Sequence, residues 1–330
     1  MKTQLRAWAL LAAAVAAATV AATAGAAPPP PTLHLEVFAQ TGIRLAAVVW
    51  TGTQFLYVEN TTTAISAAPA AGMPLRPFAA LPKLIEETRC VVAPAGHRFP
   101  AGEIYCHTPD NKIYRVSPDG KSVTVFASLR NAATSDGALA FDTVGRFGYR
   151  LVAATGRSGN PQPAGGVIYT IDAGGSVRRV GAYPGPGGTD ELVIAPSGFG
   201  DVGGWAVVDP DPGAKGGSVV AIDPHGQTRT LAALPTGPNP IAAIGRGSGT
   251  GSGAGGAPAG FYVTDTNTRN VYLARAPQLT KFSGALILAS EIGARFWVLR
   301  PQGNRFQLLE LKTDLPAANY NFEGGMYLNG

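Results

Sequence analysis

The chain has 330 residues and a formal net charge of +5, and only 14% of its residues are charged. Its Lys and Arg residues are scattered, with no run dense enough to form a nucleic-acid-binding face, so no nucleic-acid partner is expected. Glycine (43 residues) and proline (27 residues) are abundant, which is typical of short strands joined by many tight turns.

The N-terminus has the three-part layout of a secretory signal. Lys2 and Arg6 precede an apolar run over residues 7–20, and small residues follow at 24–26. The run is shorter than the roughly 20 residues of a membrane span, and no later stretch of the sequence suggests a span. We therefore expect an extracytoplasmic protein, secreted or periplasmic, with a signal peptide at 1–26, a Pro-rich tail at 27–32 and a single domain at 33–330.

A hairpin pattern recurs about every 50 residues along the rest of the chain. Its plainest copies lie at residues 102–129, 165–184 and 216–235. Each copy has an apolar strand, a turn built from Asp, Gly or Pro, and a second strand that ends in small apolar residues. A fixed period of this kind indicates one supersecondary unit stacked on copies of itself. The pattern predicts an all-β fold, a β-propeller.

We expect six blades of four antiparallel strands, in which the first strand of each blade is innermost. The last two blades are predicted from the following segments: 240–244, 261–264, 271–275 and a weak strand near 279–282 in the fifth, and 285–289, 296–299 and 306–311 in the sixth. The sixth blade lacks an outer strand. The spare segment 33–40 is predicted to cross over and complete it, which would close the ring and remove the last open edge.

Two segments fit the repeat poorly. Residues 245–260 are almost pure Gly, Ser and Ala and predict a flexible loop between two strands of the fifth blade. A Gly-rich phosphate cradle would need a following Lys-Ser/Thr pair and a helix, which the sequence lacks. Residues 317–330 read as another innermost strand with nothing after it, and an extra strand, a cap and the stump of a seventh blade remain open.

The two cysteines, Cys90 and Cys106, fall in consecutive predicted strands. Folded as a hairpin, these strands place the two residues opposite each other. Export from the cytoplasm makes a disulfide chemically reasonable, and two free buried thiols are the alternative. A bridge over a loop of this size would stabilise the fold by about 3 kcal/mol in the chain-entropy model.

Carboxylate and amide side chains recur at equivalent positions of the repeat. In a propeller, the loops before the innermost strands and those between the second and third strands gather at one mouth of the central channel. The residues there are Glu87, Asp136, Asp190, Asn239 and Glu323 from the first kind of loop, and Asp110, Asp209, Asp265 and Asn267 from the second. Converging oxygen atoms are the ligands that Ca²⁺ and Mg²⁺ require, although Asp and Asn also serve turns by bonding their own backbone.

The repeated Ile-Tyr-x-Ile-Asp hairpins resemble those of six-bladed propellers such as NHL-repeat proteins and the senescence marker protein–gluconolactonase family. That resemblance implies a divalent cation in the channel and hydrolysis of sugar lactones or related esters. Asp136, Asp190 and Asn239 are similar in position to the family's metal ligands, and Glu323 stands in a Glu-Gly pair like theirs. The family's Glu-Gly-Pro before the first innermost strand is replaced here by residues 41–44, Thr-Gly-Ile-Arg.

Two functions are therefore compatible with the sequence. The first is a monomeric binding module that holds a small ligand or a protein at the channel mouth, with a structural Ca²⁺ or another divalent cation as a possible addition. Glu87, Asp110, Asp209, Asp265 and Asn267 would contact the ligand. The second is a metal-dependent lactonase or esterase, in which Asp136 or Asp190 would act as general base while the cation polarises the carbonyl.

Overall fold

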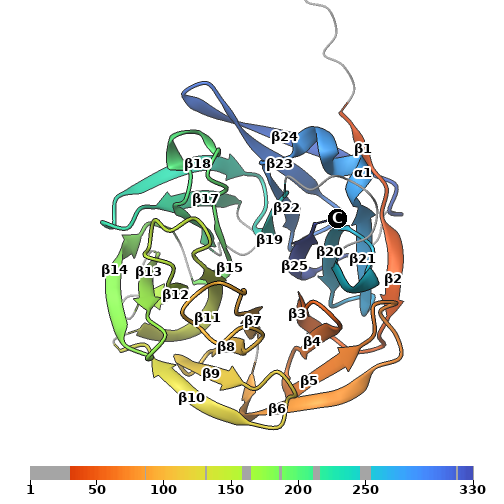
Figure 1. The fold of residues 1–330 in the computed structure, drawn as a ribbon. Coiled ribbons are helices and arrows are strands. Elements are labelled where there is room, and N and C mark those ends of the chain that lie inside the picture. Colours follow the sequence, from red (N-terminus) through yellow and green to blue (C-terminus); the bar gives the residue numbers. More distant parts are fainter. Residues whose placement is uncertain are drawn as a thin grey trace, which may run out of the picture.

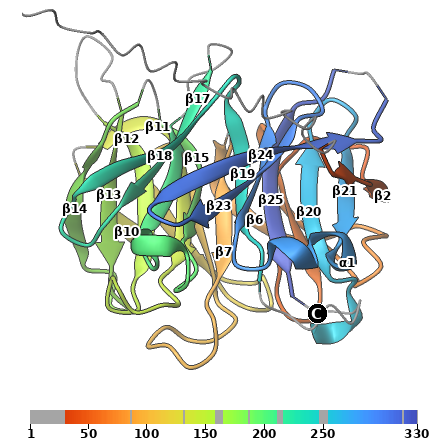
Figure 2. The ribbon, with the colours of Figure 1, turned by 90° about the horizontal axis from the view of Figure 1, so that it is seen from above.

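The repeated apolar strands pair into six sheets arranged around a central axis in the computed structural model of this chain (Figure 1). The structure describes residues 30–85, 87–130, 132–157, 165–185, 188–210, 216–245, 254–316 and 319–329. Each sheet contains four antiparallel strands, and one of them gains a short fifth strand in parallel. The strands run along the axis of the ring, as Figure 2 shows from above. The predicted six-bladed β-propeller is confirmed.

The first four blades follow the order of the chain, and in each of them the first strand is innermost. Blade 1 consists of β3 (Leu45–Trp50), β4 (Phe55–Glu59), β5 (Thr62–Ala68) and β6 (Arg76–Ile85). Blade 2 consists of β7 (Arg89–Val92), β8 (Ile104–Thr108), β9 (Lys112–Val116) and β10 (Val123–Ser128). Blade 3 consists of β11 (Ala132–Phe141), β12 (Leu151–Arg157), β13 (Gly166–Ile171) and β14 (Val177–Tyr183). Blade 4 consists of β15 (Thr189–Ile194), β16 (Ala206–Pro210), β17 (Gly217–Ile222) and β18 (Thr228–Leu234).

The last two blades exchange strands, which corrects the predicted grouping. Blade 5 contains β19 (Pro238–Ala243), β22 (Leu286–Ser290), β23 (Phe296–Gln302) and β24 (Arg305–Thr313). Blade 6 contains β25 (Phe322–Leu328), β20 (Gly260–Asp265), β21 (Asn270–Arg275) and β2 (Glu36–Gln40). The chain thus leaves blade 5 after β19, builds two strands of blade 6, returns for three strands of blade 5, and ends in blade 6.

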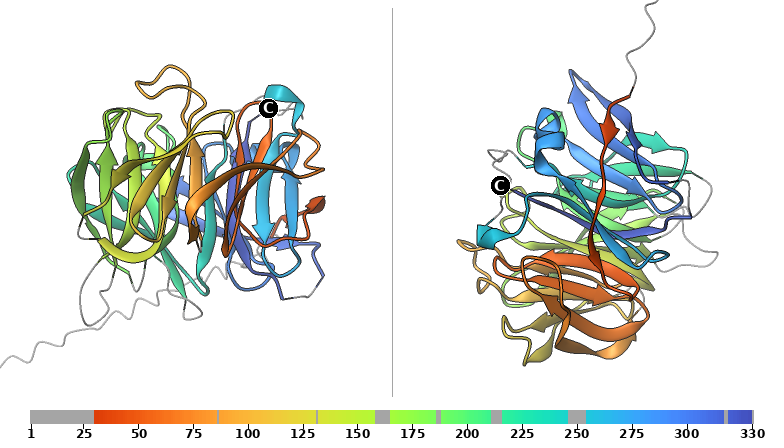
Figure 3. Two further views of the ribbon diagram at one scale, coloured as in Figure 1. Left: turned by 90° about the horizontal axis from the view of Figure 1, so that it is seen from below. Right: turned by 90° about the vertical axis from the view of Figure 1, so that its right-hand side faces the viewer.

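Both ends of the described chain take part in closing the ring. The segment 33–40 supplies β2, the outermost strand of blade 6, and so helps to close the ring as predicted. Its partner is β21, however, and not the strand near 306–311 that it was expected to complete. β1 (Thr32–Leu33) pairs in parallel with β24 of blade 5. Figure 3 shows this segment running along the outside of the two blades. The C-terminal segment is the innermost strand of blade 6, paired with β20. It is therefore neither a cap nor the stump of a seventh blade.

The structure corrects two further predictions for this part of the chain. The expected weak strand near 279–282 is helical instead, as α1 (Ala276–Leu279) followed by a 3₁₀ turn η4 (Thr280–Phe282). Pro277 lies in the first turn of α1, where its missing N–H costs no hydrogen bond. The loop 245–260 joins blade 5 to blade 6 rather than two strands of one blade; its residues 246–253 lie outside the described residues, as does the predicted signal peptide.

The core is divided into layers between neighbouring blades. Each pair of neighbours shares one cluster of buried apolar side chains, and aromatic rings fill the wider spaces. Between blades 6 and 1, for example, Phe55 packs against Tyr262 with ring centroids 5.1 Å apart. Burial between blades, rather than within a blade, is the reason that the repeats need one another to fold.

The turn of the repeated hairpin fixes the contact between successive blades. Gly120, Gly175 and Gly226 occupy the same place in blades 2, 3 and 4, each with a φ of 75–84°. A Cβ at these positions would lie 2.2, 2.6 and 2.9 Å from a backbone oxygen of the outer strand of the preceding blade. Glycine is therefore required both for the turn and for the close approach of the next blade.

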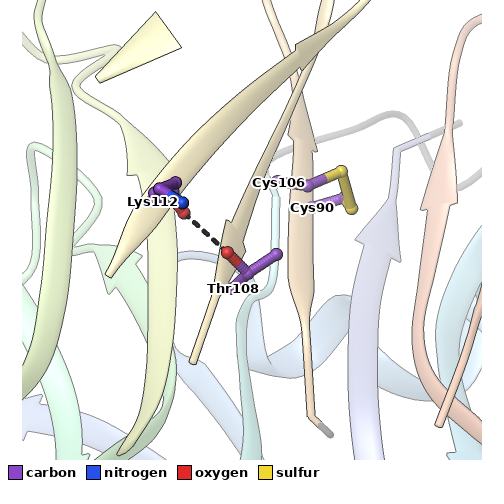
Figure 4. Close-up of a disulfide and its surroundings, with 4 residues drawn as sticks. All are labelled: Cys90, Cys106, Thr108 and Lys112. Carbon is purple, nitrogen blue, oxygen red and sulfur yellow. Dashed lines mark hydrogen bonds between the residues drawn. A yellow bond between two sulfur atoms is a disulfide. The ribbon is translucent and has the colours of Figure 1, made fainter. Parts of the chain in front are cut away.

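The predicted disulfide is present. Cys90 of β7 and Cys106 of β8 are direct cross-strand partners, with an S–S distance of 2.06 Å (Figure 4). At the end of the same strand, the hydroxyl of Thr108 donates a hydrogen bond to the backbone oxygen of Lys112. In the described part of the chain, no helix is long and apolar enough to cross a membrane.

Candidate functional site

A single arginine links five of the six blades at the centre of the ring. Arg89 is the first residue of β7 and its side chain is almost fully buried. Its Nε and Nη1 donate to the backbone oxygens of Asp190 and Ala46, both at 2.7 Å, and Nη2 donates to that of Glu323 at 3.2 Å. Nη2 also lies 3.5 Å from Asn239 Oδ1. The guanidinium therefore joins the innermost strands of blades 1, 2, 4, 5 and 6.

Three of the four predicted metal ligands gather around this guanidinium. Asp190, Asn239 and Glu323 are all at most 5% exposed. Glu323 Oε2 accepts a hydrogen bond from Asn239 Nδ2 at 3.2 Å and forms an ion pair with Arg89 at 3.5 Å. The fourth, Asp136, belongs to β11, and its side chain lies outside the described residues. The repeat thus brings these polar residues together, as the alignment of the blades predicts.

The charges around Arg89 are unbalanced toward acid. Burial alone would lower the pKa of Arg89, but the neighbouring carboxylates, Glu191 first, raise it overall and keep the guanidinium charged. Burial raises the pKa of Glu191 and of Glu323 to about 7, against the opposing effect of Arg89. Near neutral pH, these two carboxyl groups are therefore partly protonated, which limits the negative charge buried in the channel.

The oxygen cluster, as its residues lie, does not fit a divalent cation. The Arg89 guanidinium is within 3.5 Å of Asn239 Oδ1 and Glu323 Oε2, which are the atoms that would bind the ion. Among the described residues, no group of three or more His, Cys, Asp or Glu side chains is arranged to hold a metal. Metal binding here would require the Arg89 side chain to move, and it stays a prediction.

The other predicted ligand-binding residues at this mouth contact their own loops. Asp110 accepts hydrogen bonds from the Thr108 hydroxyl and from Lys112 Nζ. Asp265 accepts backbone N–H groups from its own turn and from Asn321, which precedes β25. Two further residues are also tied to neighbouring segments: the Glu87 N–H donates to Asn60 Oδ1, and Asn267 Nδ2 donates to the backbone oxygen of Asn319.

Asp209 differs from these loop residues because one of its oxygens has no hydrogen-bond partner within the described ranges. The residue is fully buried near the end of β16. Its Oδ1 accepts the backbone N–H of Glu191 at 2.8 Å, whereas Oδ2 has no hydrogen-bond partner among the described residues. Burial raises the pKa of Asp209 well above its ordinary range. Protonation of Asp209 is therefore the state that this environment favours.

His107 is a buried polar residue that the sequence did not single out. It lies in β8 as the cross-strand partner of Arg89 and is 1% exposed. Neither ring nitrogen has a geometrically good hydrogen bond within the described chain, and burial lowers its pKa to about 4. A Cβ on Gly137 would lie 2.1 Å from the ring. The ring is thus neutral and is held in a space that only glycine leaves open.

A pocket of about 450 Å³ lies along the innermost strands of all six blades. Arg89 and Glu191, near the starts of their strands, lie at one end of it, and the last residues of β3 and β25 lie at the other. Each blade contributes at least one partly exposed apolar side chain, among them Trp50, Val92, Ala140, Val193, Ala243 and Tyr327. The pocket thus has apolar walls and a polar end, and it extends away from the mouth where we predicted the site.

Sequence reasoning missed Arg89 and Glu191, although the repeat contained a signal for both. When the innermost strands are aligned, Arg89 and Glu191 occupy the position at which blades 3 and 6 have Gly137 and Gly324. A charged residue at a position that is glycine in two other blades was visible in the sequence. The importance of these charged residues could not be predicted, because it depends on how far each side chain reaches across the channel.

Comparisons with known proteins support the fold but do not show a protein family. No protein-family model matches the chain, and no curated protein matches it by sequence. Among solved structures, a chain of the nidogen–laminin complex is similar with a TM-score of 0.55 and 10% identity, covering 88% of each chain. Hydrazine synthase from Kuenenia stuttgartiensis is similar with a TM-score of 0.50 and 12% identity, covering 86% of this chain and 70% of the other.

A third structure, provisionally named a gluconolactonase, has a TM-score of 0.45 and 12% identity over 85% of this chain and 94% of that one. Identities this low establish architecture and say nothing of activity. The ring of six four-stranded sheets, together with the likeness to the nidogen–laminin chain, identifies the chain as a six-bladed β-propeller.

Proposed function

We propose that this chain is a binding propeller that holds a small molecule in the central pocket. The observation that supports the proposal is the pocket itself, which is built by all six innermost strands and has apolar walls with a polar end. Such a concave, mostly apolar site with a few polar groups is typical of small-ligand binding. The ligand would have an apolar body that fits between Trp50, Val193 and Tyr327.

Glu191 would determine the polar end of the ligand. It lines the pocket and is partly exposed, whereas Arg89 is almost fully enclosed by backbone oxygens. A carboxylate accepts hydrogen bonds, so a ligand with a primary amine or another donor head group is favoured. Because the pKa of Glu191 is raised to about 7, binding of a cationic ligand should strengthen as the pH rises from 6 to 8.

The test is a thermal-shift screen with hydrophobic amines and their matched alcohols. Ligands that stabilise the native protein are then titrated against Glu191→Gln, which removes the charge, and Ala140→Leu, which fills the pocket. The exposed Glu310→Gln serves as the matched control. Loss of binding in both pocket variants and not in the control supports the proposal. Equal binding by all four proteins would place the ligand elsewhere and overturn it.

The proposed site of action is outside the cytoplasm. The Cys90–Cys106 disulfide supports this location, since such bridges persist in oxidising compartments. Mass spectrometry of the protein recovered from periplasmic and culture-medium fractions, with thiols alkylated before reduction, tests both the location and the oxidation state. Protein confined to the cytoplasm with both cysteines alkylated would contradict it.

Metal-dependent hydrolysis of a lactone or ester is the second candidate, because the side chains of Asn239 and Glu323 lie together beside Arg89 and the backbone oxygen of Asp190 contacts the same guanidinium. Hydrolysis by this route requires the Arg89 guanidinium to move away so that the metal ion can bind. Metal analysis of the purified protein, combined with a panel of lactone substrates with and without a chelator, separates the two candidates. Stoichiometric metal with chelator-sensitive hydrolysis would favour the enzyme.

A further inference from the structure

A second, larger cavity lies near the rim of the ring, where the outer strands of blades 2 and 3 diverge. It has a volume of about 830 Å³ and is independent of the central pocket, with which it shares no residue. One wall is β10, residues 125–128, and the other is formed by alternate residues of β13 and β14: Val167, Tyr169, Val177 and Arg179. Arg130 and Gly175 complete the lining.

The cavity carries positive charge and no negative charge. Arg130 and Arg179 are the charged residues of its lining, and both are exposed. Within the part of the chain that the structure describes, neither side chain forms an ion pair. The carboxylate of the same hairpin, Asp172, accepts the backbone N–H groups of Gly174 and Ser176 within its own turn. Anions are therefore attracted to this cavity without competition from a carboxylate in its lining.

Tyr169 lies beside the backbone of both arginines. Its hydroxyl donates a hydrogen bond to the backbone oxygen of Arg130 at 3.0 Å. Arg179 is its direct cross-strand partner, on the same face of the blade. Burial raises the pKa of Tyr169, and the positive charge of nearby Arg179 opposes that rise. The two arginine side chains thus start from neighbouring backbone positions.

The opposite part of the cavity is apolar. Val125 is 53% exposed, although it is a large hydrophobic residue, and Phe126 and Val177 lie beside it in the lining. An exposed valine in a concave site next to two arginines combines the two features that an amphipathic anion requires, since guanidinium binds carboxylate and sulfonate in a fork and the apolar body leaves water.

We propose that this cavity, the blade 2–3 groove, is a binding site for a small amphipathic anion. The carboxylate or sulfonate head would bind Arg130 and Arg179, and the acyl or aryl body would cover Val125 and Val177. The site is separate from the proposed function of the central pocket, and its ligand has the opposite charge preference. The failure of either proposal therefore leaves the other standing.

The experiment titrates the native protein with 8-anilinonaphthalene-1-sulfonate and follows the fluorescence. Arg130→Ala and Arg179→Ala are each expected to weaken binding about tenfold, the loss of one charge-assisted interaction. Arg178→Ala is the matched control, because Arg178 is the exposed neighbour on the same strand and is absent from the lining. It should weaken binding less than about twofold.

Two further titrations show whether the sulfonate and this cavity are responsible for the binding. N-phenyl-1-naphthylamine, which lacks the sulfonate, should bind the wild type more weakly and should not respond to either arginine substitution. Ala140→Leu, in the central pocket, should leave binding of the sulfonate unchanged. The proposal is overturned if the wild type shows no saturable binding, if Arg178→Ala and Arg179→Ala are equally impaired, or if Ala140→Leu abolishes the signal.

Discussion

At the level of single residues, Arg89 has the largest expected effect on stability. Its guanidinium is surrounded by oxygens from four other blades. Arg89→Ala leaves Glu323 and three backbone oxygens without their donor, and removal of one partner of a buried pair costs about 3–5 kcal/mol. Arg89→Lys keeps the charge, but an ammonium group cannot donate to all of these oxygens as the planar guanidinium does. An intermediate loss of stability is therefore expected. Urea unfolding measures both.

A calcium titration of the same variants tests whether Arg89 takes the place of a cation. Arg89→Ala should gain melting temperature on addition of Ca²⁺, because the oxygens that it exposes are hard ligands. The wild type should not. The exposed Arg300→Ala serves as control. A wild-type shift as large as that of Arg89→Ala would show that the ion binds without displacing the guanidinium.

Glu323 gives the folded state a pH dependence of defined sign. The pKa of its carboxyl group is about 7 when folded, against an ordinary value of 4.5. The folded protein therefore binds more protons between these values, and its stability falls as the pH rises from 4.5 to 7 and then levels off. The slope is about 1.4 kcal/mol per pH unit for each such group.

Replacing Glu323 by Gln removes this group while retaining an acceptor for Arg89, so unfolding free energies measured from pH 4.5 to 8 should fall less steeply. Glu191, with a pKa also raised to about 7, and Asp209, whose pKa is also raised, contribute to the slope that remains. His107, with its pKa lowered to about 4, contributes a slope of the opposite sign. The control Glu310→Gln should follow the wild type. An unchanged slope in Glu323→Gln would mean that this carboxyl group titrates alike in the folded and unfolded states.

The sequence predicted which polar residues meet at the channel but not what they contact. Asp190, Asn239 and Glu323 share a position in the repeat, and the ring brings equivalent positions together. The contacts of Arg89 and His107 required information beyond the repeat, even though the repeat marked the position of Arg89. The first depends on a side chain spanning the channel, and the second on the missing Cβ of Gly137 in the neighbouring blade.

At the level of elements, the hairpin turn of each blade is limited by the blade before it. Gly120 has a φ of 75°, and a Cβ there would lie 2.2 Å from the backbone oxygen of Phe78 in β6. Gly96 has a similar φ of 83° with nothing within 4 Å. Gly96→Ala should cost only the strain of the left-handed conformation, about 1–2 kcal/mol.

Gly120→Ala should cost clearly more than Gly96→Ala, because either β6 or the turn must move. Urea unfolding with equal m-values for the two variants is the measurement. Equal losses of stability would indicate that the two blades separate here without cost, and that the contact between the turn and the outer strand does not hold the blades in register.

The strands themselves were predictable, whereas the assignment of the last strands to blades was not. Alternating apolar residues and Asp/Gly turns identify β13, β14, β17 and β18 from the sequence alone. The grouping failed after β19, because it assumed that consecutive strands pair with each other. The loop of Gly, Ser and Ala that follows β19 contains no preference for the same blade over the next one.

At the level of the whole molecule, the exchange of strands between blades 5 and 6 links these two blades and closes the ring. β19 pairs with β22, while β20 and β21 lie in the next blade between β25 and β2. Blades 5 and 6 are therefore joined by four passages of the chain, β1 to β2, β19 to β20, β21 to β22 and β24 to β25. Neither blade is complete until the last strand, β25, has been placed, so the C-terminal strand should be required for cooperative folding.

Deleting residues 319–330 is expected to abolish the cooperative thermal transition. The deletion removes the inner partner of β20 and the Glu323 contact to Arg89, and it exposes the cluster around Phe296. Deleting residues 30–40 removes only outer strands and should lower the melting temperature while the transition stays cooperative. Near-UV circular dichroism and calorimetry of the two shortened chains compare these outcomes directly.

A milder substitution keeps this prediction testable if the shortened chain fails to express. Phe322 is fully buried at the start of β25 and packs against Phe296 with ring centroids 5.0 Å apart. Phe322→Ala should destabilise the protein by about 3–5 kcal/mol, as buried phenylalanine truncations do, and it should broaden the transition, because blade 6 loosens before the others. A sharp transition shifted by less than that of Gly96→Ala would show that the ring closes without its last strand.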